Sequence, residues 1–79
     1  MSPTVFRERG YRFFFFSREE ARPHIHVYSG DGEAKFWIEP GVEMVRNYGL
    51  SKTQLSEIQK IIEEHRDVIQ TAWREHFGD

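Results

Sequence analysis

The sequence predicts an α+β domain in which an antiparallel β-meander of four to five short strands is followed by one long C-terminal α-helix packed on the sheet. Short apolar runs separated by turn residues fill the first part of the chain, and such runs are typical of strands. A helical repeat of apolar residues fills the last third. With 79 residues, the chain is long enough for a single domain with one thin core, so residues 1–79 are taken as one domain.

The first two strands are expected at residues 4–7 and 11–16. Gly10 separates the two apolar runs, which predicts a hairpin. The four consecutive phenylalanines of residues 13–16 direct rings to both faces of the second strand. This pattern fits either a central strand that is covered on both sides or an exposed aromatic face used for binding.

A second hairpin is expected from residues 24–28 and 33–39, which flank a Ser-Gly-Asp-Gly turn. A two-residue loop at residues 31–32 is one solution, because Asp-Gly is a strong hairpin signal. A loop at residues 30–31 is the alternative. A fifth short strand is expected at residues 42–46.

The two loops predict the same faces but different neighbours for the histidines. With the first loop, His24 lies opposite Glu39 and His26 opposite Trp37. With the second loop, His24 lies beside Trp37 and His26 beside Lys35. Both solutions remain open from the sequence alone.

The helix is predicted over residues 52–77, with Ser51 as its N-cap and Gln54 completing a capping box. At 1.5 Å per residue such a helix is ~39 Å long, about twice the length of a five-residue strand. It therefore either breaks near residues 65–67 or overhangs the sheet, and the prediction is one long overhanging helix. The overhang would expose an apolar stripe that suits a second copy or another protein, made of Ile69, Ala72, Trp73 and Phe77.

Composition excludes several classes of protein. There is no cysteine, which excludes disulfide and thiolate chemistry. No apolar run approaches the ~20 residues of a membrane span, and no signal peptide is recognisable, so a soluble cytoplasmic protein without membrane contact is expected. The net charge of −2 argues against a generic nucleic-acid binder. It leaves open an enzyme that contacts RNA through a local patch.

The candidate site is the third strand, because alternation places His24, His26 and Tyr28 on one face. Lys35 and Glu39 of the next strand share that face, so these five residues are the candidate catalytic set. One interpretation is general acid–base chemistry, since the ordinary histidine pKa of ~6.5 lies near working pH. A second is a divalent metal such as zinc or iron, with Glu39 as third ligand. A third is that the histidines only stack against Trp37. No cofactor is expected, and the metal stays unknown.

The order of motifs resembles a small bacterial family of unknown function, DUF 4160, over essentially the whole chain. The segments that carry the resemblance are residues 3–6, 10–15, 23–27, 32–40, 46–51 and 72–77. Pro-His-Ile-His-Val at 23–27 and Ala-Lys-Phe-Trp at 34–37 are the specific parts. The chain departs from the family pattern at Arg22, where a second proline is common, and at Arg74, where asparagine is expected.

The resemblance implies the toxin of a type II toxin–antitoxin pair whose partner is a DUF 2442 protein. By that analogy His24 and His26 would be central to toxicity. The leading functional expectation is therefore a growth-inhibitory toxin that acts on RNA and is silenced by an antitoxin-type partner. The alternatives are a non-catalytic protein-interaction module and a metal-binding accessory domain. Homo-oligomerisation through the C-terminal helix is a further expectation.

Overall fold

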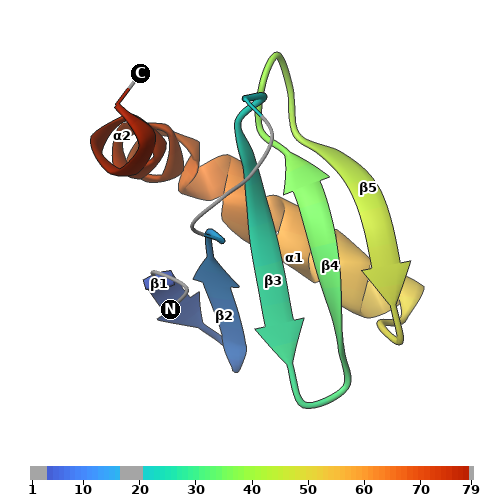
Figure 1. Cartoon of the computed structure of the whole chain (residues 1–79). Helices are drawn as coiled ribbons and strands as arrows, with labels where there is room; N and C mark the ends of the chain where they lie inside the picture. Colours follow the sequence, from blue (N-terminus) through green and yellow to red (C-terminus); the bar gives the residue numbers. More distant parts are fainter. Residues whose placement is uncertain (1–3, 17–20, 79) are drawn as a thin grey trace.

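The computed structural model describes residues 4–16 and 21–78. Five strands lie side by side in chain order and form one antiparallel sheet, α1 crosses one of its faces, and α2 lies near one end of the sheet (Figure 1). The elements are β1 (Thr4–Glu8), β2 (Tyr11–Phe14), β3 (His24–Ser29), β4 (Gly32–Trp37), β5 (Glu43–Tyr48), α1 (Lys52–Glu64) and α2 (Arg66–Phe77). The predicted α+β meander is therefore confirmed.

The first hairpin turns through Arg9 and Gly10, as the sequence indicated. Both residues have positive φ, 54° and 83°. Two consecutive positive φ values are what the tightest hairpin turns require, and glycine adopts them without a steric penalty. This turn places Phe6 opposite Phe13, and the two rings stack with centroids 4.4 Å apart.

The second hairpin has the alternative register. Ser29 pairs with Gly32, so the loop is at residues 30–31, and the prediction of a loop at 31–32 as the first solution is wrong. The physical reason lies in β5. A Cβ atom on Gly32 would overlap the carbonyl oxygen of Tyr48, so residue 32 can only be glycine where β4 passes beside β5.

The helical prediction needs a correction, because the chain forms two helices. The break is at His65, whose φ of −109° and ψ of 17° end α1. The His65 ring stacks on Phe6 at 4.6 Å. The guanidinium of Arg66 donates hydrogen bonds to the carbonyl oxygens of Ile38 and Pro40. These contacts with the sheet turn the chain, so that the helix follows the end of the sheet and does not run past it.

The predicted capping box at the start of α1 is confirmed. The backbone N–H of Gln54 donates to the Ser51 hydroxyl oxygen at 3.1 Å. The backbone N–H of Ser51 donates to the side-chain oxygen of Gln54 at 2.9 Å. Two otherwise unpaired helix N–H groups are satisfied in this way. The start of α1 is thus determined by local chemistry.

The predicted apolar overhang does not exist, because α2 packs into the core. Ile69 is fully buried and Trp73 is 6% exposed, while Ala72 and Phe77 are partly buried against the same cluster. The core lies between the sheet and the helices. Its fully buried members are Phe13, Ile25, Val27, Phe36, Ile38, Ile58, Ile62 and Ile69.

A polar contact ties the first hairpin to α1. The carboxylate of Glu57 accepts hydrogen bonds from Arg9 and from the Tyr11 hydroxyl, each at 3.0 Å. Burial and this hydrogen bond raise the pKa of Tyr11, and the two donors lower the pKa of Glu57. The contact joins the turn of the first hairpin to α1.

The close approach at Gly32 makes the register testable by substitution. Gly32→Ala is expected to destabilise the fold by about 1–3 kcal/mol, because the new methyl group meets rigid backbone. Gly30→Ala is the matched control, since no atom lies within 4 Å of its Cβ position. Urea unfolding of both variants measures the difference. Equal stability of the two variants would contradict the close approach of Gly32 to Tyr48.

Candidate functional site

The face of the sheet opposite α1, called the open face below, carries the candidate site. In Figure 1 this face is turned toward the viewer and α1 crosses behind it. Strand pairing arranges its side chains in rows that run across β2 to β5. The open face consists of Arg7, Arg12, Phe14, Phe16, His24, His26, Tyr28, Glu33, Lys35, Trp37, Glu43, Arg46 and Tyr48.

His24 is the inner of the two histidines and is fully buried. Its Nδ1 lies 2.7 Å from the carbonyl oxygen of Arg22, so Nδ1 carries the proton that this hydrogen bond needs. Its ring also packs edge-on against Trp37 and against Trp73 of α2, with centroids 5.7 and 5.0 Å apart. His24 therefore connects the sheet to α2 and is not offered to a ligand.

His26 is the outer histidine, and its ring lies 5.1 Å from that of His24. It is 8% exposed and is flanked by Phe14 at 5.5 Å and Phe16 at 4.4 Å. It also lines a small hollow of about 60 Å³ on the open face. The other residues around this hollow are Phe16, Glu33, Ala34, Lys35, Arg46 and Tyr48. Of the two histidines, His26 is the one that meets a surface hollow.

Positive side chains surround the histidines. Lys35 is the cross-strand neighbour of His26, and Arg46 is the next residue in the same row. The Lys35 ammonium lies 4.9 Å from the Trp37 ring centroid, and the Arg22 guanidinium lies 4.2 Å from it. Both are cation–π distances. An anionic group in the hollow would therefore lie beside both an imidazole and cations.

Two tyrosines form the exposed part of the open face. Tyr28 and Tyr48 are 52% and 61% exposed, and they flank Glu33 in one row across β3, β4 and β5. With strands ~4.8 Å apart, the backbones of the two tyrosines are ~10 Å apart. Both rings are thus available to stack on planar groups.

Glu39 lies apart from the other candidate residues. Since His24 pairs with Trp37, Glu39 lies beyond the end of the β3–β4 ladder, and the predicted proximity of Glu39 to His24 is wrong. Its carboxylate accepts a hydrogen bond from Gln70 at 3.1 Å, and it lines a separate hollow with Trp73. Four of the five predicted site residues therefore share the open face.

This position of Glu39 removes the third ligand of the predicted metal site. Within residues 4–16 and 21–78, no group of three histidine or carboxylate side chains is arranged to hold a metal ion.

No helix in the same part of the chain is long and apolar enough to cross a membrane.

Five residues of the hollow were not among the predicted site residues, namely Phe16, Glu33, Ala34, Arg46 and Tyr48. Arg46 and Tyr48 are the two that β5 contributes. The fifth strand was predicted to end at residue 46, whereas β5 continues to Tyr48. The alternation of Arg46 and Tyr48, two residues apart, was the signal that would have placed both on the open face.

Comparison with known proteins places the chain in a family. The model of a family described as "Domain of unknown function (DUF4160)" matches residues 10–74. The chain belongs to this family. The matched region runs from the first hairpin turn to the last turns of α2, so it includes the whole candidate site except Arg7. No curated protein and no solved structure is significantly similar to the chain.

The burial of His24 predicts a structural role that can be measured. His24→Ala is expected to cost about 2–4 kcal/mol of unfolding free energy, because the substitution leaves a cavity and an unpaired Arg22 carbonyl. Tyr28→Ala, on the same strand face but exposed, should change stability by no more than about 0.5 kcal/mol. Urea unfolding compares the two. A fully stable His24→Ala protein would contradict this role.

Proposed function

We propose that this protein is a growth-inhibitory toxin that binds single-stranded RNA on the open face and acts on it through His26. The observation that carries the proposal is the combination of exposed aromatic rings and cations around one histidine that lines a hollow. Single-stranded nucleic acids are bound by such a combination, because bases stack on aromatic side chains and phosphates pair with cations.

Stacking would be provided by Tyr28 and Tyr48, with Phe16 beside them. These are three of the large exposed side chains on the sheet, and every base has a π-face that can stack on them. A flat sheet surface suits extended strands better than a duplex, whose bases are already stacked. The proposal therefore specifies single-stranded RNA.

The charge distribution supports the same ligand. Although the net charge of the chain is −2, the strand positions of the open face carry four cations and two carboxylates. The cations are Arg7, Arg12, Lys35 and Arg46, and the carboxylates are Glu33 and Glu43. A local positive patch of this kind attracts phosphates even when the whole chain is acidic.

The chemistry proposed for His26 is proton transfer during strand cleavage. The ribose 2′-hydroxyl would attack the adjacent phosphorus, giving up its proton to His26 while the P–O bond to the next nucleotide breaks. The leaving 5′-oxygen takes a proton from solvent, His26 then returns its own proton to solvent, and Lys35 and Arg46 would stabilise the charge on the phosphate. The products are a 2′,3′-cyclic phosphate and a 5′-hydroxyl, so no further reactant is needed.

We also propose that the toxin works in the cytoplasm, where RNA is available, and that a protein partner of the antitoxin type holds it inactive. This part of the proposal rests on the family resemblance. A partner that covers the open face would block the tyrosines and the hollow together.

RNA binding is tested with a labelled, unstructured RNA of about ten nucleotides. The double variant Tyr28→Ala, Tyr48→Ala is expected to bind at least about tenfold more weakly in fluorescence anisotropy, since each stacked base contributes roughly 1–3 kcal/mol. Met44→Ala is the matched control, because Met44 is an exposed apolar residue of β5 that pairs with Phe36 of the core layer. Equal losses in the two proteins, or no binding by the unsubstituted protein, would refute the proposed ligand.

The role of His26 is tested by expression in a bacterial host without a partner. The unsubstituted protein should stop growth and fragment cellular RNA, and His26→Gln should abolish both effects while the protein stays folded. His76→Gln makes the same change at an exposed histidine of α2 and should remain toxic. Undiminished inhibition by His26→Gln would remove His26 from the activity. Binding of RNA without any growth effect would favour the non-catalytic interaction module.

A further inference from the structure

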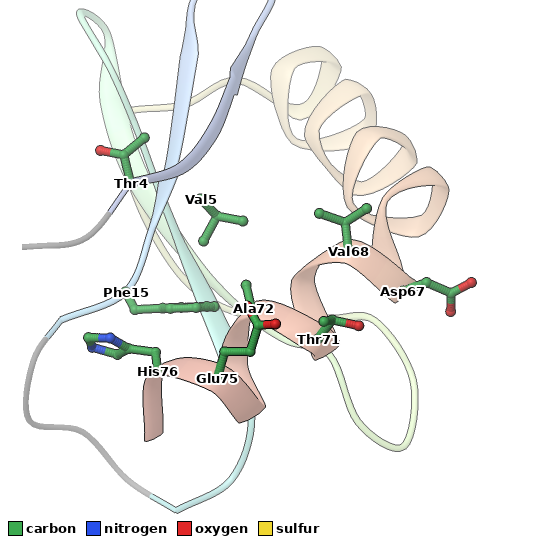
Figure 2. Close-up of a pocket in the computed structure, with 9 residues that line it drawn as sticks. All are labelled: Thr4, Val5, Phe15, Asp67, Val68, Thr71, Ala72, Glu75 and His76. Carbon is green, nitrogen blue, oxygen red and sulfur yellow. The ribbon is translucent and has the colours of Figure 1, made fainter. Parts of the chain in front are cut away.

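A second hollow of about 480 Å³ lies between β1 and α2, away from the open face (Figure 2). We call it the β1–α2 groove. Its lining residues are Thr4, Val5, Phe15, Asp67, Val68, Thr71, Ala72, Glu75 and His76. The groove adjoins the open face at Thr4, which pairs with Phe14 and accepts a hydrogen bond from Arg12.

The inner part of the groove is apolar. Figure 2 shows the side chains of Val5, Val68 and Ala72 around the space, with the Phe15 ring along one side. Val68 and Ala72 are four residues apart and therefore share one face of α2. Val68 is 53% exposed although it is apolar, and the small Ala72 leaves the hollow beside it. This surface would gain free energy if a partner covered it.

The rim of the groove is acidic. Asp67 and Glu75 lie two helical turns apart on α2, ~12 Å along the helix axis, and both are exposed. The lining contains no lysine or arginine. Arg74 donates a long hydrogen bond of 3.5 Å to Thr71, but Arg74 itself lines the separate hollow that contains Glu39 and Trp73. The groove thus presents two carboxylates beside an apolar floor.

The groove also adjoins an unpaired strand edge. β1 is the first strand of the sheet and pairs only with β2 in the part of the chain that the structure describes. Its outer backbone N–H and C=O groups are therefore available to an added strand. Side chains of an added strand alternate, so every second one would point toward α2 and the groove.

We propose that the β1–α2 groove binds an extended segment of another protein whose groove-facing residues, every second one along the segment, are apolar in the middle and basic at the ends. The segment pairs with the outer edge of β1 by backbone hydrogen bonds, as in strand addition. Its apolar side chains enter the space between Val5, Val68 and Ala72. A lysine or arginine at the rim then pairs with Asp67 or Glu75. This proposal is independent of RNA binding, because it uses no residue of the open face.

The probe is a fluorescent peptide of about ten residues in which every second residue is serine and the residues between are valine, with lysine at both ends of this groove-facing set, compared with a peptide that has glutamate in place of these lysines. The protein should bind the lysine peptide, and the glutamate peptide should bind at least about tenfold more weakly, since like charges at the rim repel. Val68→Gln and Glu75→Lys should each weaken binding of the lysine peptide by about tenfold. Glu75→Lys is a mild change for the fold, because a cation suits the last turn of a helix.

Glu63→Lys is the matched control. It makes the same charge change near the C-terminal end of α1, at an exposed residue that does not line the groove, and it should bind the peptide as the unsubstituted protein does. Circular dichroism confirms that each variant is folded. Absence of binding, or equal weakening by Glu63→Lys and Glu75→Lys, would overturn the proposal. A dimer of the unsubstituted protein that Val68→Gln dissociates would also overturn it, since the groove would then hold a second copy.

Discussion

The close approach of Gly32 to the backbone of Tyr48 is the constraint on which the arrangement of the site depends. Since no side chain fits between the two strands at this point, only glycine at position 32 lets β4 and β5 pair with Lys35 opposite Arg46. A shift of one residue in the pairing would move every cross-strand neighbour. The β3–β4 register puts Lys35 beside His26, and the β4–β5 register puts Arg46 next in the same row. The β3–β4 register also leaves Glu39 outside the ladder.

The bend at His65 is the second feature that shapes the molecule. It turns α2 along the end of the sheet, where Trp73 packs against His24 and Phe15. His24 is therefore held by the core, and His26 alone faces the hollow of the open face. The bend also creates the β1–α2 groove, because it brings the outer side of α2 next to β1 (Figure 2). The bend at His65 therefore has two consequences. It gives His24 a structural role while His26 stays at the hollow, and it forms the β1–α2 groove.

The two surfaces have opposite chemistry, which the net charge of −2 conceals. The open face combines cations with exposed rings, whereas the groove combines carboxylates with aliphatic side chains. The net charge of the chain argued against nucleic-acid binding. Binding depends on the charges near the ligand, however, because salt screens charges more than ~8–10 Å away. A small two-layer domain can keep the two patches apart because a sheet edge lies between them.

The features that local chemistry controls were predictable from the order of the residues. Strand alternation, the Arg9-Gly10 turn and the Ser51 capping box predicted the meander, the start of α1 and the shared face of His24, His26 and Tyr28. The hairpin register, the break at His65 and the burial of His24 were decided by the tertiary structure. The helical period continues through His65, so local preference favoured one unbroken helix. Asp-Gly is a good loop in isolation, so local preference favoured a hairpin loop at residues 31–32. Contacts between distant residues, Gly32 with Tyr48 and His65 with Phe6, outweighed those preferences because backbone overlap and ring packing act only once the chain is folded.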